Sequence, residues 1–544
     1  MKSSLSKYSR LFHTLKYLKF TQIYYRALYK FKSAKVKSVE IFGNRSWSWH
    51  GPSLFEQSIF NETRVRFLNK DGEIVDRDDW NSDQYSKLWL YNLHYFDDLS
   101  SVGAEVREQL HYKFVNRWIK ENPPCLGNGW EPYPISLRLV NWVKWFSEKT
   151  SVDERYLASM DLQAQALLQQ LEYHILGNHL FANGKALVFV GAFLKSVSSE
   201  KYLEKGLKIL DFEVNEQFLN DGGHFELSPM YHSILLWDLL ELIGLAQISQ
   251  NSALAHRLSK WNAIAKKALS WLQGMIHKDG EVSFFNDAAI GIAHCPSDIF
   301  KYAEQLGLSW HQPDTPLHVQ KASGYATVEY EKYSFIFDHA QVGPDYLPGH
   351  AHADTLSFEL SVGDERIFVN SGTSLYGISD ERLRQRQTAA HNTVEVCGQS
   401  SSEVWSGFRV ARRAKATLEE ATACQDYVRL TASHDGYKRL RPKVNHKRSI
   451  TANANGLKIE DTLTEKVSAV FHLHIHPDVT CARINSNVIQ LKSKKGKKLT
   501  FKADSDIELL PSTYHPNFGV TIANNKIVIP FESGCLVTRI DVEG

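Results

Sequence analysis

The stretch DYLPGHAHADTLSFELSVGDERIFVNSGTSLYG, residues 345–377, carries the clearest structural signal in the chain. Its central part, TLSFELSV, alternates apolar and polar side chains, which is typical of a half-buried β-strand. Pro348-Gly349 predicts a turn shortly before that strand. After an arginine-rich link, AHNTVEV at 390–396 predicts another strand. The stretch therefore indicates a β-sheet in this part of the chain.

Three histidines accompany these strands. His350 and His352 are two residues apart, so an extended chain would place both side chains on the same side, at the mouth of a strand. Asn370 and His391 follow within the same region. Imidazoles grouped in this way predict either a metal site or an acid–base site.

The period of two continues to the end of the chain. Short alternating segments such as YSFIFDH, YVRLTAS, LKIEDTL and AVFHLHIH follow one another from about residue 316. Asn455-Gly456, between two of these segments, predicts a hairpin turn. His472, His474 and His476 fall on one face of a strand without a carboxylate or cysteine nearby, so we interpret them as structural.

The preceding part of the chain has a helical period instead. Between about residues 101 and 315, apolar side chains recur four residues apart, as in Val106, Leu110 and Phe114. Loops rich in Gly, Asn and Pro separate these segments. Repeated helix pairs with similar loops favour an α/α toroid or barrel, and the lack of a fixed sequence period argues against a regular solenoid.

Helices first and strands second predict an α + β arrangement of separate domains rather than βαβ units. A chain of 544 residues also exceeds one ordinary core. We place the boundary near residue 315, in the stretch HQPDTPLHVQ. The predicted division is 1–100 for a basic helical arm and irregular lead-in, 101–315 for the helical domain and 316–544 for the β domain.

The charge of the chain is nearly balanced overall but uneven along it. The net charge of +2 argues against a dedicated nucleic-acid-binding protein. Residues 2–37, however, contain ten Lys or Arg and no acid. This segment is either a surface helix attracted to anionic lipid or an arm that packs its aromatic face on the main body; the many aromatic residues favour the arm.

The sequence gives weak signals for a cellular location and for disulfide bonds or metal-binding cysteines. The first twenty residues are interrupted by charges, and no run approaches the roughly 18 apolar residues of a membrane span, so the expected location is cytoplasmic by default. Six cysteines are scattered without CxxC pairs, which is neither a disulfide framework nor a zinc-finger pattern. The many Trp and Tyr residues could line a sugar-binding cleft or simply fill cores.

Together, several motifs identify a resemblance. GNHLFANGKAL from residue 177, DGGHFELSPMYH from 221, GHAHADTLSFEL from 349, VNSGT from 369 and AHNTVEV from 390 resemble the heparinase II/III-like polysaccharide lyases. The resemblance runs from about residue 90 to beyond residue 410. It implies an incomplete (α/α) toroid followed by a C-terminal antiparallel β-sandwich domain, an anionic polysaccharide substrate and cleavage by β-elimination next to a uronic acid. It would also allow a periplasmic location.

The resemblance implies roles for particular residues. A donor must neutralise the uronate carboxylate and stabilise the enolate, which falls to Asn178 with His179. Tyr231 and His350 would then act as acid and base. The implied substrate-binding residues are Trp130, Arg138, Glu226, Tyr376, Arg382 and Arg386. A tyrosine base needs its pKa lowered by positive charge, which Arg384 and the other arginines of this set could supply.

The resemblance also raises the question of a structural zinc ion. Relatives hold zinc through two His and an Asp, and the matching positions here are His352, Asn370 and His391. Asn370 replaces the Asp, and a neutral amide is a poorer zinc ligand than a carboxylate. Three outcomes remain open: weak zinc binding, substitution by Asp354 or another acid, or a hydrogen-bonded cluster that holds the loop.

Two other functions stay open at this point. The protein could hold an anionic glycan without cutting it, as a binding or biosynthetic component of surface-polysaccharide (capsule or O-antigen) assembly; the basic segment and the Asn370 departure motivate this alternative. A hydrolase would need paired carboxylates across a cleft, for which Glu131, Glu226 and Asp287 are candidates. The His, Tyr and Asn set favours elimination.

Overall fold

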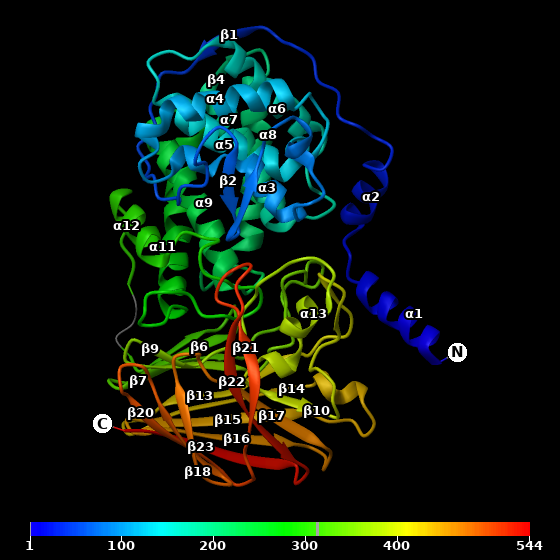
Figure 1. Ribbon diagram of the computed structural model, residues 1–544, viewed down its shortest axis with the longest axis vertical. Helices are drawn as coiled ribbons and strands as arrows, with labels where there is room; N and C mark the ends of the chain where they lie inside the picture. The colour runs from blue at the N-terminus through cyan, green and yellow to red at the C-terminus, as the bar shows by residue number, and fades with distance from the viewer. Residues whose placement is uncertain (1, 312–314, 544) are drawn as a thin grey trace.

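A computed structural model describes residues 2–311 and 315–543. A helical domain and a β domain are stacked along the long axis of the molecule (Figure 1). The last helix of the first domain ends at Gln305 and the first strand of the second begins at Leu317. Of the stretch in which we placed the boundary, residues 312–314 lie outside the described part. The predicted class, a helical domain followed by an antiparallel β domain, is confirmed.

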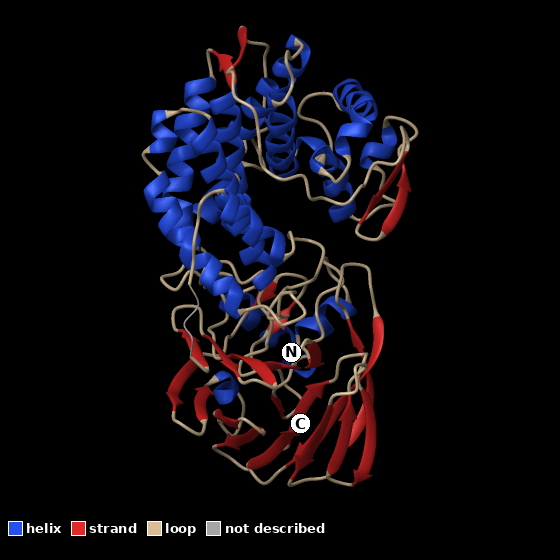
Figure 2. Ribbon diagram, turned by 90° about the vertical axis from the view of Figure 1, so that its left-hand side faces the viewer, coloured by secondary structure: helices blue, strands red, loops and turns tan. Residues whose placement is uncertain are grey.

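The helical domain is built around helices that are apolar on nearly all sides. The helices are α3 (Lys87–Tyr95), α4 (Glu108–Glu121), α5 (Pro132–Ser147), α6 (Glu154–Gln169), α7 (Gly177–Phe193), α8 (Ser199–Gln217), α9 (Pro229–Ile248), α10 (Ser252–Ala255), α11 (Leu258–Gly274) and α12 (Pro296–Gln305). Nearly every side chain of α7 and α9 is buried, as expected of helices without a polar face. Helix α7 contacts α5, α6, α8 and α9, and α9 contacts α10, α11 and α12. The gathering of the helices in one half of the molecule is consistent with the predicted toroid (Figure 2).

The β domain contains three main antiparallel sheets. The first has the strands β5 (Leu317–Gln320), β6 (Tyr325–Glu329), β7 (Tyr333–Asp338), β8 (Phe358–Val362) and β9 (Glu365–Phe368), in that order. The second has the order β13 (Ala416–Ala423), β14 (Val428–His434), β15 (His446–Asn453), β16 (Gly456–Leu463), β23 (Cys535–Val542), β20 (Lys498–Ala503), β19 (Val488–Lys492) and β18 (Thr480–Asn485). The third has the order β10 (Val394–Val396), β17 (Ala469–His474), β22 (Ile522–Phe531) and β21 (Glu508–Tyr514).

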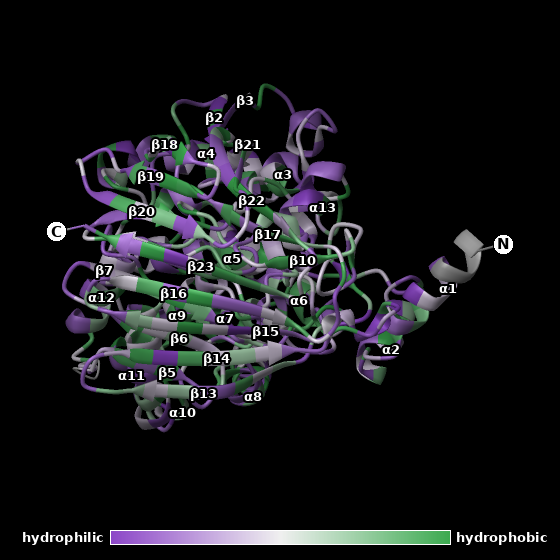
Figure 3. Cartoon of the chain, turned by 90° about the horizontal axis from the view of Figure 1, so that it is seen from below, coloured by the Kyte–Doolittle hydropathy of each residue, from purple (hydrophilic) through white to green (hydrophobic). Residues whose placement is uncertain are grey.

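These sheets share one apolar core. Inward side chains from all three sheets form a single cluster of buried residues, and the bridge between Phe368 and Ile475 links the first sheet to the third. Figure 3 shows the alternation of polar and apolar residues along β14, β15, β16 and β23. This is the pattern of a two-layer sandwich.

Two local expectations need correction. The predicted hairpin joins β15 to β16, but Asn453 pairs with Gly456, so its loop consists of residues 454 and 455. Gly456 has a φ of +145°, and a Cβ there would collide with the carbonyl of Ile540. Strand β8 is buried on both faces rather than one, because the helical domain covers its outer side. His277, at the end of α11, hydrogen-bonds to Glu359 of β8 at 2.8 Å.

The N-terminal segment consists of α1 (Lys2–Leu15) and α2 (Phe20–Leu28), followed by an extended chain. It lies along the side of the molecule and contacts both domains: Trp405 bonds to Thr14, and Tyr29 bonds to the Leu171 carbonyl. Five of its eight Tyr and Phe side chains are exposed, whereas Tyr25 and Tyr29 pack on Tyr173 and His174. The favoured interpretation, an arm that packs its aromatic face on the main body, is therefore correct for Tyr25 and Tyr29 and wrong for the exposed side chains. In the part of the chain that the structure describes, every helix is too short or too polar to cross a membrane.

Candidate active site

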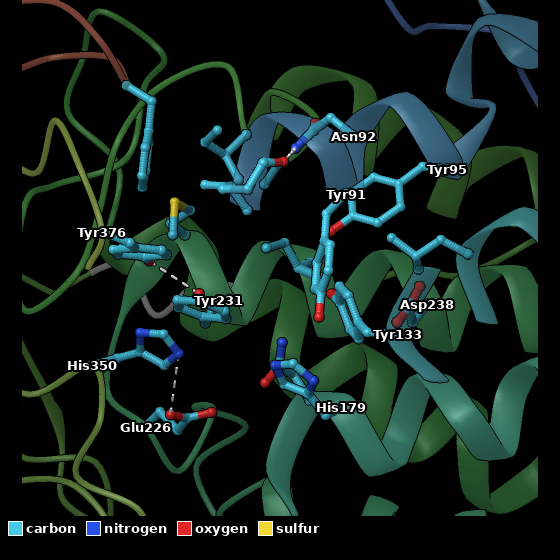
Figure 4. A pocket seen from close by; sticks show the side chains of 18 of the residues that line it. Tyr91, Asn92, Tyr95, Tyr133, His179, Glu226, Tyr231, Asp238, His350 and Tyr376 are labelled. Carbon is cyan, nitrogen blue, oxygen red and sulfur yellow. Dashed lines mark hydrogen bonds and ion pairs between the residues drawn. The ribbon is translucent and has the colours of Figure 1, made fainter. Parts of the chain in front are cut away.

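A cavity of about 1120 Å³ lies where the two domains meet. Its walls come from α3, α5, α7 and α9 on the helical side and from the loops around residues 345–350, 376 and 408 on the β side. Figure 4 shows Tyr231, Tyr376, His350 and Glu226 grouped together, with His179 and Tyr133 across from them. Each domain therefore supplies part of one site.

His350 presents one ring nitrogen to this cavity. Its Nδ1 lies 2.8 Å from Asp287 Oδ2, and its backbone carbonyl accepts from the Asp287 amide at 3.0 Å. Its Nε2 has no such partner within the described residues and lies 3.9 Å from Glu226 Oε2. Burial lowers the pKa of His350, against the opposing effect of Asp287. A neutral imidazole that donates from Nδ1 keeps a free lone pair on Nε2, which is the state required of a base.

Asp287 is the fixed anion behind this histidine. It accepts from His350, from His352 Nε2 at 2.8 Å and from both terminal nitrogens of Arg382. Burial alone would raise the pKa of Asp287, but the Arg382 guanidinium and the two histidines hold it well below its ordinary value. The carboxylate thus stays ionised and selects the tautomer of His350.

Tyr231 stacks on His350, with ring centroids 3.9 Å apart and an interplanar angle of 30°. It lies in the first turn of α9, where the Ser228 hydroxyl caps its amide at 3.1 Å and Pro229 opens the helix. Its hydroxyl is 3.0 Å from that of Tyr376. Burial raises the pKa of Tyr231 well above its ordinary value. The expected lowering of this pKa by arginines is therefore wrong, and Tyr231 is a protonated phenol.

Asn178 and His179 occupy the first turn of α7. The chain enters this helix through Gly177, whose φ is +59°; a Cβ there would lie 2.5 Å from Leu347 Cδ2. Glu172 fixes His179 by accepting from Nδ1 at 2.9 Å. Both residues line the cavity. They sit at the positive end of a buried helix dipole, where a carboxylate is favoured.

Glu226 is the unusual carboxyl of the site. It is 2% exposed, and neither oxygen has a hydrogen-bond partner within the described residues. Burial raises the pKa of Glu226 to about 8, and the charge of Asp287 adds to this effect. At neutral pH the group is therefore protonated and can donate a hydrogen bond into the cavity.

The structure brings together only part of the predicted substrate-binding set. Glu226 and Tyr376 line the cavity. Trp130 and Arg138 lie in the helical core, where Arg138 donates to Gln163 and to two carbonyls. We therefore correct the assignment of Trp130 and Arg138: neither is placed to touch a substrate in the cavity.

The two arginines of α13 (Asp380–Arg386) need the same correction. Arg382 and Arg386 are fully buried and lie behind the cavity wall. Arg382 holds Asp287, and Arg386 donates to the carbonyls of Ala351 and Gly407. Their positive charges were expected to attract substrate, but the fold uses them to orient the loop that carries His350.

The three residues considered for zinc form a chain of hydrogen bonds. His391 Nε2 is 3.2 Å from His352 Nδ1, while its Nδ1 is 3.1 Å from Asn370 Oδ1. These contacts leave the ring in opposite directions, whereas the ligands of one zinc ion converge on a point. Asn370 Oδ1 also accepts from Ser357 at 2.8 Å, and Asp354 accepts from the Asn286 amide. The donor set as arranged does not fit zinc, because its atoms do not converge on one point; that the cluster holds the loop stays a prediction.

Sequence reasoning missed several groups that complete the site. Glu172 and Tyr133, which support and flank His179, carried no motif. A buried ionic cluster also lines the cavity: Lys144, Lys185, Asp238 and Glu241. The helical spacing of Asp238 and Glu241 on α9 was a readable signal, because two acids three residues apart share a helix face. The candidate hydrolase pair is not assembled: Glu131 bonds to Lys87 and Tyr91 outside the cavity wall, and Asp287 is fully engaged.

Comparisons with known proteins match this chain along nearly its whole length. The family model described as heparinase II/III N-terminus matches residues 20–304, and that described as heparinase II/III-like, C-terminal, matches residues 312–541. A crystal structure of heparinase III superposes with a TM-score of 0.68 at 18% identity, covering 91% of this chain and 83% of that one. This last likeness concerns the fold alone.

Curated relatives are of two kinds. A heparin-sulfate lyase of Bacteroides stercoris is 25% identical over 306 residues, which is 49% of this chain and 43% of that protein. A second, from Bacteroides thetaiotaomicron, is matched over 26% of its length, so the chain spans less than half of these relatives. FtsZ-localized protein C of Caulobacter vibrioides is 24% identical over 495 residues, covering 84% of this chain and 81% of that protein.

Proposed function

The chain belongs to the heparinase II/III-like polysaccharide lyase family, and on that premise we propose that it cleaves a uronic-acid-containing polysaccharide by β-elimination. One observation carries the proposal most directly. A neutral imidazole and a protonated phenol, His350 and Tyr231, stack face to face on the cavity wall. A base and an acid on neighbouring positions suit a reaction at two neighbouring carbons.

The proposed step uses these two groups in turn. His350 Nε2 takes the C5 proton of the uronate, the C5–H electron pair forms a C4–C5 double bond, and the C4–O4 bond breaks. The Tyr231 hydroxyl donates its proton to the departing O4. The reaction leaves one chain with a new hydroxyl end and a second chain that begins with an unsaturated uronate. Asp287 stabilises the imidazolium that forms in this step.

The uronate carboxylate needs neutral donors to make its C5 proton acidic. Asn178, at the start of α7, and protonated Glu226 both line the cavity, and Glu226 Oε2 lies 3.9 Å from His350 Nε2. Such donors stabilise the enolate more than the ground state, because negative charge builds on the carboxylate oxygens as the proton leaves. We assign Asn178 as the main donor and Glu226 as a second.

The charges of the wall favour a sparsely charged substrate. Five Lys or Arg line the cavity against seven Asp or Glu besides the protonated Glu226. Lys144 and Lys185 are also paired with Glu241 and Asp238. A densely sulfated chain would find little net positive potential there. The substrate class that fits is an unsulfated or weakly sulfated uronate chain.

Purified protein incubated with a panel of uronate polysaccharides provides the test. Ultraviolet absorbance from the conjugated C4–C5 double bond should rise with wild type. Tyr231→Phe keeps the stacked ring and loses only the acid, and His350→Ala loses the base; each should lower turnover at least about a hundredfold. Unchanged melting temperatures would show that both variants fold.

The outcomes separate the candidate reactions. Near-wild-type turnover in either variant would remove that residue from the mechanism. New reducing ends without absorbance would indicate hydrolysis. Binding of a glycan without any cleavage would favour the second candidate, a non-cutting or biosynthetic glycan-binding protein of the cell surface. The match to FtsZ-localized protein C, whose name does not describe a lyase, extends over most of both chains.

A further inference from the structure

Each of the two N-terminal helices has large apolar side chains that are exposed on the surface of the protein. In α1, Tyr8 and Phe12 are 71% and 64% exposed. In α2, Phe20 and Ile23 are 78% and 52% exposed. An amphipathic helix that packs on its own domain would bury such side chains, whereas these two helices leave them exposed.

The polar faces of the same helices hold the segment on the body. Ser9 accepts from Arg412 at 2.7 Å, and Thr14 accepts from Trp405 at 3.1 Å. In α2, the buried Gln22 donates to the carbonyls of Ile175 and Tyr346. These contacts fix the orientation of the two helices, which lie at the edge of the molecule (Figure 3).

The charge of the segment selects the partner. All ten ionisable side chains other than His and Tyr in residues 2–37 are Lys or Arg, while the rest of the chain carries a net negative charge. Exposed aromatic and aliphatic side chains flanked by lysines are the composition of a helix that lies in the headgroup region of a bilayer. A soluble polyanion would use the lysines but would leave the apolar side chains in water.

We propose that α1 and α2 form a membrane-binding arm that inserts its apolar face into an anionic lipid surface. Leu11, Leu15 and Leu18 of the arm also line the cavity. The docked protein would therefore hold the mouth of its cavity against the bilayer, next to glycan chains anchored there. This inference stands on the arm alone and does not depend on the reaction proposed above.

Vesicle sedimentation of the full-length protein tests the proposal. Wild type should sediment with vesicles of phosphatidylcholine and phosphatidylglycerol, far less with phosphatidylcholine alone, and less as salt rises. The triple variant Phe12→Ser, Phe20→Ser and Phe31→Ser should weaken binding at least about tenfold. A matched triple variant at exposed apolar positions elsewhere, Phe42→Ser, Val106→Ser and Phe212→Ser, should bind as wild type does.

A second variant separates charge from apolar insertion. Replacing Lys7, Lys16, Lys30 and Lys32 by Gln should reduce binding to anionic vesicles while leaving the melting temperature unchanged. Equal binding by wild type and the arm variants would overturn the proposal. So would a lack of vesicle binding combined with a dimer that the Phe12, Phe20 and Phe31 substitutions dissociate, because a second copy would then cover the face.

Discussion

At the scale of single residues, two buried carboxyl groups on either side of His350 are in opposite states. Asp287 accepts hydrogen bonds from Arg382 and two histidines, and its pKa stays well below the ordinary value. Glu226 has no hydrogen-bond partner among the residues that the structure describes, and burial raises its pKa to about 8. The same functional group thus serves as a permanent anion in one position and as a hydrogen-bond donor in the other.

Glu226→Gln should separate these roles. In the wild type, Glu226 loses its proton as pH rises through about 8, so activity should fall by up to about tenfold per pH unit. The amide of the variant remains a donor and cannot ionise, so the variant should keep its activity in this range. Because the folded-state pKa of Glu226 is raised, its contribution to stability is present below about pH 4.5 and is lost as pH rises through 8.

Melting temperatures between pH 5 and pH 9 provide the companion measurement. The variant should be the more stable protein at pH 9, with the difference shrinking toward pH 5. Identical pH profiles of activity and stability in both proteins would show that Glu226 does not titrate in this range. Loss of activity in the variant at every pH would instead assign the acid itself a proton-transfer role.

At the scale of elements, the starts of two buried helices create the site. Asn178 and Tyr231 both lie in the first turn of a helix, α7 and α9, and both helix starts line the cavity. The backbone at the start of α7 has a specific conformation: Gly177 is left-handed, and the Leu347 side chain leaves no space for a Cβ there. Such an entry fixes the direction of the side chain that follows it.

Gly177→Ala should therefore disturb both stability and catalysis. We expect a loss of about 2 kcal/mol, part from the left-handed backbone and part from crowding at Leu347 and Glu226. Turnover should fall more than substrate affinity, because the enolate donor would be misplaced. Calorimetry and initial rates on the same preparation provide the measurement.

Gly280→Ala is the matched control for this change. Gly280 has a φ of +91°, but in the described part of the chain no atom lies within 4 Å of an added Cβ. Its substitution should cost only the backbone strain, about 1 kcal/mol, with unchanged turnover. Equal losses of stability and activity in both variants would mean that the packing around Gly177 has no special role.

Sequence patterns predicted where helices and strands lie better than they predicted which side chains are buried. The helix starts in GNHLFANG and DGGHFELSPMYH and the order of helices and strands follow from local periodicity and capping residues. Exposure depends on long-range contacts instead. Arg382 reads as a surface arginine in a charged link, yet it is buried against Asp287, 95 residues away in the chain. Local sequence likewise gave no sign that Tyr231 would be deeply buried and keep its proton.

At the scale of the whole molecule, the site exists only where the two domains meet. Tyr325 of the β domain donates to the Leu227 carbonyl at 2.6 Å, and Trp271 donates to Ser323 at 2.8 Å. These bonds bring Tyr231 from one domain onto His350 from the other. The same junction determines the charge that a substrate meets, because the acids that line the cavity come from both domains.

This charge leads to a prediction about substrate preference. A sulfated glycosaminoglycan and its chemically desulfated form share one backbone, so comparing them isolates the effect of sulfate. The excess of acids along the cavity should make kcat/KM at least about tenfold higher for the desulfated chain. Salt should change that rate little, since few counterions would be displaced. Faster cleavage of the sulfated chain, with a rate that falls steeply as salt rises, would mean that exposed arginines such as Arg66 and Arg409 dominate the approach of the substrate instead.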